Sequence, residues 1–301
     1  MTLPSIALIG FGEVGQTLAA DLQARGIDDL IAWDRLFTDP QSPPARAARS
    51  AGIAAAHGLR AAVAGRDIVV SAVTAAECVA VATEAAPALR QDAFFVDLNS
   101  AAPSSRSAAA TVIGKVGGRY VELAVMSPIA PRRSASPMLA GGPHAAAFLP
   151  LGRALGFTGI ELFAEDIGRA SAAKMCRSVM VKGMEALLAE SLLAARRYGV
   201  EDAVIASLQD LFPMDDWRSH ARYMVSRSLL HGRRRAEEMR EAARTVADAG
   251  LSPWMSEACA ERQDWASGHA AALRQEQLGD MLDAMLAATP PAAAPLRGAP
   301  A

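Results

Sequence analysis

A lysine on a long helical segment could carry out proton transfer. Residues 168–199 contain no proline and are rich in Ala, Leu, Met and Glu, so the sequence predicts one long helix. Lys174, Ser178 and Lys182 are spaced four residues apart and share one face of this helix, with Arg177 close by. A lysine on an apolar helix must be paired or must lower its pKa, which suits it to act as a general acid or base. The alternative is that these lysines reach solvent at the helix edge.

The apolar positions of this segment cover most of its circumference. A helix of this kind is expected to be buried rather than to lie at the surface. The apolar residues are Met175, Val179, Met180, Met184, Leu187, Leu188, Leu192 and Leu193.

A glycine-rich loop near the start of the chain could hold the pyrophosphate of a dinucleotide. The pattern G-x-G-x-x-G stands between an apolar run at 5–9 and a helical segment at 16–25. Its glycines allow a tight turn, a close approach of the backbone to phosphate and close helix–strand packing, while the helix N-terminus supplies amide donors. The predicted cofactor-binding residues are Gly10, Phe11, Gly12, Glu13, Val14, Gly15, Asp34, Arg35, Val73, Thr74 and Asn99.

The choice between NAD and NADP depends on Asp34. It ends the second apolar run, about 20 residues after the glycine loop, where an acid holds the ribose hydroxyls of NAD. Its neighbour Arg35 could instead hold the 2′-phosphate of NADP, so both cofactors stay open and NAD is favoured. The alternative is that Asp34 only caps a turn.

Strands and helices alternate through the first half of the chain. Strands are expected at 5–9, 30–33, 52–54, 68–73, 94–97, 120–125 and 138–140, and helices at 16–25, 76–89 and 104–116. This alternation predicts an α/β domain with a doubly wound, mostly parallel sheet of the Rossmann type. Ligands bind such sheets at the C-terminal ends of the strands. The polar residues at these ends are Asp34, Thr74, Asn99, Ser100 and Ser127.

The second half reads as all-α. Helices are expected at 200–211, 215–231, 233–249 and 254–265. The sequence thus predicts a cofactor-binding domain at 1–167, a helical substrate and dimerisation domain at 168–288 and a disordered tail at 289–301.

A basic cluster, residues 231–235, falls at the junction of two of these predicted helices. It is either a solvated helix start or an anion-holding group in which His231 or one arginine binds a carboxylate. Arg132 and Arg133 compete for that role.

Composition excludes several classes of protein. The chain has 301 residues, of which 51% are hydrophobic and 21% charged, with a formal net charge of −2. This length suits two domains, and the small charge gives no reason to expect a nucleic-acid or membrane partner. The three cysteines are far apart and lack metal spacing, which favours a reducing cytosol and no metal site. No transmembrane segment is expected, and we predict a cytoplasmic protein.

The motifs together resemble those of the β-hydroxyacid dehydrogenase superfamily, which includes 3-hydroxyisobutyrate and 6-phosphogluconate dehydrogenases. Besides the glycine loop, residues 97–103 (DLNSAAP) resemble its D-x-S-T-x-x-P motif, and residues 168–174 (GRASAAK) resemble G-x-G-x-x-x-K. Ser178 stands where the family has Asn, Ala170 replaces a Gly, and Met126-Ser127-Pro128 replaces a Ser-Gly-Gly loop. The pattern at residues 174–183 (KMCRSVMVKG) resembles that of a poorly characterised phosphogluconate-dehydrogenase-like subgroup.

This resemblance implies a function and a site. The expected reaction is reversible NAD(P)-dependent hydride transfer at the hydroxyl carbon of a small anionic β-hydroxy acid, in a homodimer joined through the helical domain. Lys174 would be the catalytic lysine, assisted by Ser178 and Asn99. The expected substrate-binding residues are Ser100, Ser127, Arg177, Lys182 and His231. Alternatives are an imine reductase, an oxidative decarboxylase and a non-catalytic dinucleotide-binding module.

Overall fold

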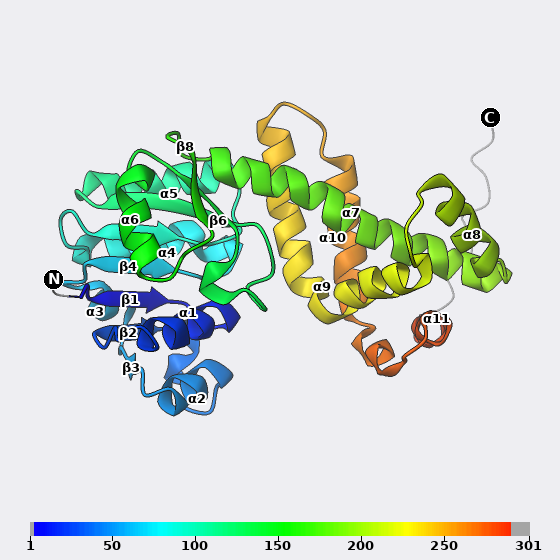
Figure 1. Cartoon of the computed structure of the whole chain (residues 1–301), viewed down its shortest axis with the longest axis horizontal. Helices are drawn as coiled ribbons and strands as arrows, with labels where there is room; N and C mark the ends of the chain where they lie inside the picture. The colour runs from blue at the N-terminus through cyan, green and yellow to red at the C-terminus, as the bar shows by residue number, and fades with distance from the viewer. Residues whose placement is uncertain (1–2, 290–301) are drawn as a thin grey trace, which may run out of the picture. The chain divides into compact units, whose positions relative to one another are not determined.

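An eight-stranded sheet forms the first half of the protein. The structure is a computed structural model that describes residues 3–289 (Figure 1). The strand order is β3-β2-β1-β4-β5-β6-β7-β8, and all neighbours are parallel except β6 and β7. The strands are β1 Ile6–Ile9, β2 Leu30–Trp33, β3 Ala54–Ala55, β4 Ile68–Ser71, β5 Phe94–Asp97, β6 Arg119–Val125, β7 Met138–Gly141 and β8 Ile160–Ala164. The predicted doubly wound, mostly parallel sheet is confirmed.

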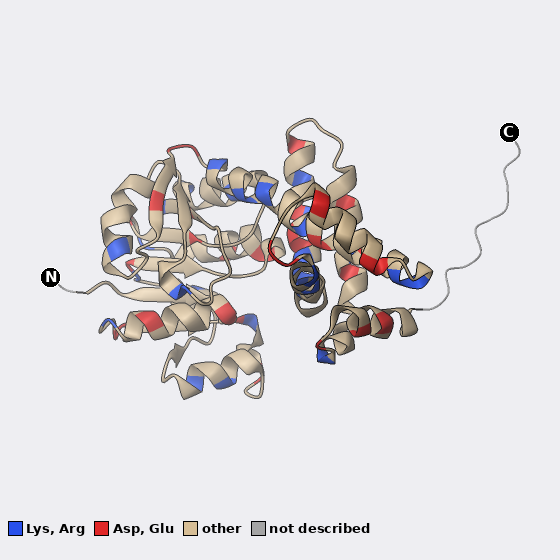
Figure 2. Cartoon of the chain, turned by 45° about the vertical axis from the view of Figure 1, so that its right-hand side comes forward, with Lys and Arg blue, Asp and Glu red and all other residues tan. Residues whose placement is uncertain are grey.

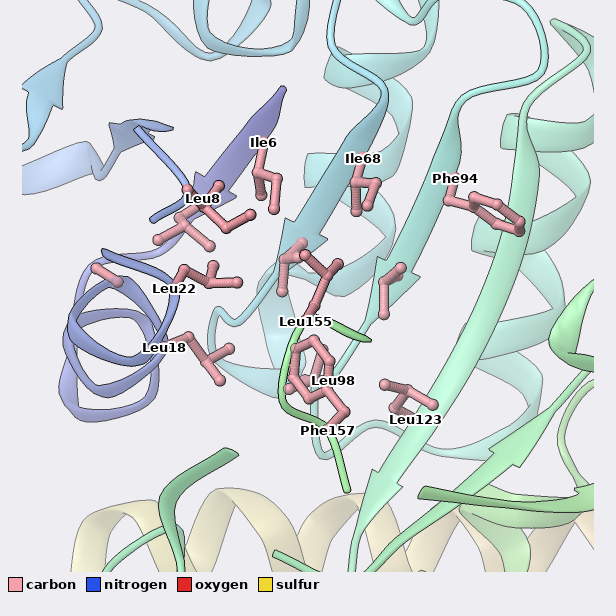
Figure 3. Packing of buried hydrophobic residues seen from close by; sticks show 14 of the residues in the cluster. Ile6, Leu8, Leu18, Leu22, Ile68, Phe94, Leu98, Leu123, Leu155 and Phe157 are labelled. Atoms are coloured by element: carbon pink, nitrogen blue, oxygen red, sulfur yellow. The ribbon is translucent and has the colours of Figure 1, made fainter. Parts of the chain in front are cut away.

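Helices cover both faces of this sheet. Successive strand residues point to opposite sides, so both faces carry apolar side chains that need to be covered. Leu8 and Val70 pack with Leu18 of α1 on one face, whereas Val69 packs with Val81 of α4 on the other. Figure 3 shows strand residues of the first face packed beside Leu18 and Leu22. The helices of this half are α1 Glu13–Gln23, η1 Arg35–Thr38, α2 Pro43–Ser50, α3 Leu59–Val63, η2 Ala75–Glu77, α4 Cys78–Ala85, η3 Ala86–Ala88, α5 Pro103–Lys115, η4 Arg133–Ala135 and α6 Ala145–Ala154.

The chain divides into two compact units. The first unit joins the described residues up to Ser178 with Glu241–Pro253, and the second joins Val179–Arg240 with the described residues from Trp254 onward. Helices α7 (Arg169–Tyr198) and α9 (Trp217–Asp248) therefore each contribute to both units. The boundary predicted at residue 168 lies directly before α7. Apart from Thr289, the predicted tail lies outside the described residues.

The second unit is helical, as the sequence predicts. Apolar side chains of its helices form one core that includes Leu192, Val225 and Met281. Besides parts of α7 and α9, it contains α8 Glu201–Leu211, α10 Trp254–Ser267, η5 Ala270–Arg274 and α11 Leu278–Ala287. Among residues 3–289, none of the helices has both the length and the apolar character needed to cross a membrane.

The two helices predicted at 215–231 and 233–249 are one helix, α9. The prediction was wrong because it treated Gly232 as a helix stop. Gly232 is instead a packing position: a Cβ there would lie 2.5 Å from the carbonyl oxygen of Gln263 on α10. The basic cluster 231–235 therefore lies inside a helix and not at a junction.

The prediction that α7 is buried on most sides was also wrong in part. Leu188 and Leu192 are buried, but Met180 and Leu187 are 65% and 57% exposed, and Met184 is 39% exposed. These three exposed residues follow one another at helical spacing and form an apolar stripe, called here the α7 stripe. The short third strand lies at Ala54–Ala55 rather than at 52–54, and α2, α3, α6, β8 and α11 were not predicted.

Candidate functional site

Two glycines of the motif that follows β1 are required by packing. Gly10 has φ +90°, and a Cβ on it would lie 2.4 Å from the carbonyl oxygen of Ala72, which follows β4. A Cβ on Gly15 would lie 2.1 Å from the carbonyl oxygen of Gly10. These contacts bring β1, β4 and α1 together at the carboxyl edge of the sheet.

The remaining glycine of the motif, Gly12, faces open space. A Cβ on Gly12 would meet no described atom within 4 Å. Gly12 is the N-cap of α1, and within the described part of the chain no side-chain bond caps the helix there. Its backbone amides can therefore receive an anion, and the loop fits the pyrophosphate of a dinucleotide. Glu13 stands in the first turn, and Val14 packs against the core.

Asp34 links this loop to the end of β2. One carboxylate oxygen, Oδ2, accepts a hydrogen bond from the Phe11 amide at 2.8 Å, and Oδ1 accepts one from the Leu36 amide at 2.9 Å. Asp34 thus caps η1, while its role at a ribose stays a prediction. Its neighbour Arg35 lies 3.3 Å from Glu77 Oε1 in a solvent-exposed ion pair.

Asn99 joins the ends of β4 and β5. Its Oδ1 accepts a hydrogen bond from the Val73 amide at 2.7 Å, and its Nδ2 donates to Ser71 Oγ at 3.0 Å. Asn99 is buried, and Thr74, beyond Val73, is exposed. The structure therefore gives the Asn99 side chain a bridging position between two strand ends, and its predicted contacts with cofactor and substrate stay predictions.

Lys174 meets the next residue of the same loop. Its Nζ donates a hydrogen bond to Ser100 Oγ at 2.8 Å. Lys174 is partly buried on α7, and Ser178, one turn later on the same face, is 7% exposed. The predicted pair of Lys174 and the Asn-Ser loop is thus brought together within the first unit.

Lysine is rare in this chain. Of the 30 Lys and Arg residues, only Lys115, Lys174 and Lys182 are lysines. Lys115 is exposed near the end of α5. Arginine stays protonated under all ordinary conditions, whereas lysine can exchange its proton when its surroundings lower its pKa. Most positive charges of this chain are arginines, whereas position 174 has a lysine, which can exchange its proton.

Other predicted residues lie in the loop after β6 or contact it. Arg177 Nη1 donates to the carbonyl oxygen of Met126 at 2.7 Å, which ties α7 to this loop, and Ser127 Oγ donates to the Pro128 carbonyl at 3.0 Å. Arg133 Nε donates to Asp21 Oδ1 at 2.7 Å and so anchors the loop to α1. Of the two arginines that competed for the anion, Arg133 is therefore already paired with a carboxylate.

Lys182 and His231 belong to the second unit. Lys182 Nζ lies 2.7 Å from Glu238 Oε2, and its side chain is 9% exposed. Both acidic and basic residues occur along the helices of this unit (Figure 2). His231 lines a cavity of about 500 Å³ together with Arg233 and Ser267. The predicted contacts of these two residues with a substrate stay predictions.

The environment of His231 keeps it neutral. Burial, followed by the positive charges of Arg227, Arg234 and Arg235, lowers its pKa to about 4. At neutral pH it could hydrogen-bond an anion but would bring no charge of its own. Within residues 3–289, no group of three or more His, Cys, Asp or Glu side chains is arranged to hold a metal ion.

Sequence reasoning missed the carboxylate that caps the start of α7. Glu122, fully buried on β6, accepts hydrogen bonds at Oε1 from the amides of Gly168 and Ala170, at 3.1 and 3.0 Å. Its Oε2 accepts one from Ser171 Oγ at 3.2 Å. A single carboxylate inside an apolar strand was the signal that could have revealed it, because a buried charge requires partners.

Comparisons with known proteins agree with this arrangement. Residues 5–151 match the family model described as the NAD binding domain of 6-phosphogluconate dehydrogenase, and residues 195–266 match a domain of unknown function (DUF1932). Together with the fold, these matches support an NAD(P)-dependent oxidoreductase of the 3-hydroxyacid dehydrogenase type.

Solved structures cover nearly the whole chain. A conserved hypothetical protein from Sinorhizobium meliloti 1021 is 37% identical, with 94% of this chain and 96% of that chain covered and a TM-score of 0.73. A conserved protein of unknown function, described as structurally similar to 3-hydroxyacid dehydrogenases, is 32% identical over 88% of this chain and 97% of its own, with a TM-score of 0.66. The 3-hydroxyisobutyrate dehydrogenase of Mycobacterium tuberculosis, determined with L-serine, is 16% identical over 95% and 99% of the two chains (TM-score 0.70) and shares the fold. With its cofactor loop, its sheet and these relatives taken together, the chain belongs to the β-hydroxyacid dehydrogenase superfamily.

Proposed function

We propose that this protein catalyses reversible hydride transfer between a nicotinamide cofactor and the hydroxyl carbon of a small anionic β-hydroxy acid. The observation that carries the proposal is the 2.8 Å hydrogen bond between Lys174 Nζ and Ser100 Oγ. It lies in the same unit as the glycine loop, at the carboxyl edge of the sheet, where doubly wound folds bind their ligands. A proton-exchanging group beside a cofactor loop is the arrangement that alcohol oxidation requires.

In this mechanism the bound cofactor would supply the hydride chemistry. Lys174 takes the proton from the substrate hydroxyl during oxidation and returns it during reduction. To do so near neutral pH, its ammonium must lose the proton readily, and the nearby positive charge of Arg177 would favour that loss. Ser100 and Ser178 would orient the hydroxyl by hydrogen bonding, and Arg132 would hold the carboxylate.

We further propose a preference for NAD over NADP. The Asp34 carboxylate stands at the end of β2, where it would accept bonds from ribose hydroxyls and repel a 2′-phosphate. The ion pair of Arg35 with Glu77 supports the same preference, since it draws the arginine toward a carboxylate. An exposed pair of this kind contributes at most about 1 kcal/mol, so Asp34 carries most of the argument.

The decisive experiment is a titration of the purified protein with NADH and with NADPH, followed by nicotinamide fluorescence. The proposal expects tighter binding of NADH, followed by reduction of NAD in the presence of β-hydroxy acids. Release of carbon dioxide would indicate an oxidative decarboxylase, and turnover of cyclic imines alone would indicate an imine reductase. Binding without any turnover would indicate a binding module, and failure to bind either cofactor would contradict the proposal as a whole.

We also propose that the active form is a homodimer joined through the helical unit. The α7 stripe of Met180, Met184 and Leu187 supports this proposal, because three large apolar side chains at helical spacing are exposed in a single chain. Apolar surface of this kind marks contact sites on soluble proteins. A second copy of the chain is the partner we propose for it.

A further inference from the structure

Arg106 is fully buried next to the candidate site and does not reach it. It lies on α5, and its guanidinium donates to two backbone carbonyls, those of Asp97 at 2.5 Å and of Asn99. Its Nη1 also lies 3.1 Å from Asp97 Oδ1. Since the two carbonyls flank Leu98, the arginine fixes the turn that ends in Ser100.

Asp97 strengthens this turn from the opposite side. Its Oδ1 accepts a hydrogen bond from the Asn99 amide at 2.8 Å. Its Oδ2 accepts bonds from the Tyr120 hydroxyl at 2.6 Å and the Cys78 thiol at 3.2 Å. Burial, followed by the charge of Asp97, raises the pKa of Tyr120 well above its usual range and that of Cys78 to about 12, so both groups stay protonated and donate.

Glu122 holds the other partner of the hydrogen bond. By accepting bonds from the amides of Gly168 and Ala170 and from Ser171, it fixes the first turn of α7, and Lys174 stands one turn beyond Ser171. The carboxylate also suits the positive end of the helix dipole. Burial alone would lower the pKa of Arg106, but the negative charges of Asp97 and Glu122 raise it, so the two anchoring groups belong to one electrostatic cluster.

We propose that Arg106 and Glu122 are positioning residues that together set the distance and direction between Lys174 Nζ and Ser100 Oγ. Their importance for catalysis rests on the function proposed above for Lys174. Arg106 fixes the loop that carries the acceptor, and Glu122 fixes the helix that carries the donor.

A purely structural role would account poorly for these charges. Buried ion pairs seldom stabilise a protein more than well-packed apolar residues of the same size would, because both ions lose their hydration. Here the backbone groups that Arg106 bonds belong to the turn before Ser100, and those that Glu122 bonds belong to the start of α7. An apolar core could fill the space, but it could not fix those carbonyls and amides.

The test follows the three lysines directly and needs no substrate. Protein carrying ¹³C,¹⁵N-labelled lysine would be titrated with pH by NMR, with Lys174 assigned through its loss in Lys174→Ala. In Arg106→Gln the Lys174 midpoint should fall by about half a pH unit or more, because an ammonium that loses a hydrogen-bond acceptor gives up its proton more easily. Lys115 should not change. The matched control is Arg119→Gln. Arg119 lies at the N-terminal end of β6 and donates to the Asp92 carbonyl.

Glu122→Gln provides a second variant, since it keeps the shape of the side chain and an oxygen acceptor for α7. Its Lys174 midpoint should fall as well. This variant replaces Arg106→Gln in the test if Arg106→Gln does not fold. A folded variant of either kind in which Lys174 keeps its wild-type chemical shift and midpoint would overturn the proposal. Once a substrate is known, either variant should lower kcat by roughly 10- to 100-fold and leave cofactor affinity within about twofold. A wild-type protein without turnover would contradict the proposed function but leave the NMR result intact.

Discussion

The Phe11 amide and the Asp34 carboxylate lie 2.8 Å apart, which ties the glycine loop after β1 to the end of β2. A second tie exists on the other side, where Gly10 packs against Ala72 after β4. The loop is thus held between its two neighbouring strands, and of the three glycines of the motif, Gly12 is the one that faces open space. The three glycines of the motif therefore have separable roles.

Gly12→Ala should abolish tight cofactor binding without loss of stability. The new methyl group meets no described atom within 4 Å, so the fold tolerates it, but it would occupy the space in which a pyrophosphate approaches the backbone. We expect the Kd for NADH to rise at least about tenfold, with Tm unchanged within about 2 °C. Nicotinamide fluorescence and thermal unfolding measure the two quantities.

Gly10→Ala is the matched variant and should show the opposite pattern of damage. Its Cβ would stand 2.4 Å from a backbone oxygen, and its φ of +90° disfavours any side chain. We expect a loss of about 1–3 kcal/mol in the free energy of unfolding. Equal effects of the two substitutions on stability would show that Gly12 does not face open space.

Lys174→Ala should lower kcat by roughly 100- to 10,000-fold, because it removes the group that exchanges a proton with the substrate. Cofactor affinity should stay within about threefold of the wild type. Lys115→Ala is the control, since it removes an exposed lysine of the same unit and should leave turnover unchanged. Wild-type kcat in Lys174→Ala would exclude this lysine as the acid–base group.

Much of the fold follows from local sequence signals. The apolar runs at β1, β4 and β5 were recognisable because these parallel strands are buried on both faces and appear as continuous apolar stretches. α2 and α3 were missed because they are short and rich in alanine and arginine. The error in α9 had a different cause, since the close approach of α10 to Gly232 is a tertiary contact with no local signature.

The candidate site was predictable in its parts but not in its connections. Gly12, Asn99, Ser100 and Lys174 could be named because their residue types and spacing match a motif. The sequence could not reveal that the Asn99 side chain is already bonded to Val73 and Ser71, nor that Glu122 caps α7 from a strand 46 residues earlier. Such contacts join residues far apart in sequence, and no periodicity records them.

Met184→Glu combined with Leu187→Glu should convert the proposed dimer into a monomer. Each substitution places a charge in the α7 stripe, where burial against a second chain would be costly. Light scattering coupled to size-exclusion chromatography measures the mass directly. Val116→Glu, at an exposed apolar position in the first unit, serves as the control and should remain dimeric. A wild-type protein that is monomeric at micromolar concentration would remove the basis of this prediction.

His231 should make the protein less stable as the pH falls below neutrality. In an unfolded chain a histidine takes up its proton near pH 6.5, whereas burial and the surrounding arginines lower the pKa of His231 to about 4. Between these pH values the unfolded state binds more protons than the folded state. The contribution of His231 to stability is therefore present above pH 6.5 and is lost as the pH falls toward 4.

The variant His231→Asn tests this expectation, because asparagine does not titrate. Urea unfolding at pH 7.5 and pH 5.0 should show a smaller loss of stability in the variant than in the wild type. NMR of the histidine rings gives an independent measure, in which the signal lost in the variant identifies His231 and should remain that of a neutral ring down to about pH 4. If a substrate carboxylate binds beside this ring, as predicted for the cluster 231–235, its addition should raise the titration midpoint of His231, since a nearby negative charge favours the protonated form. An unchanged midpoint at saturating substrate would exclude His231 as the anion-holding residue.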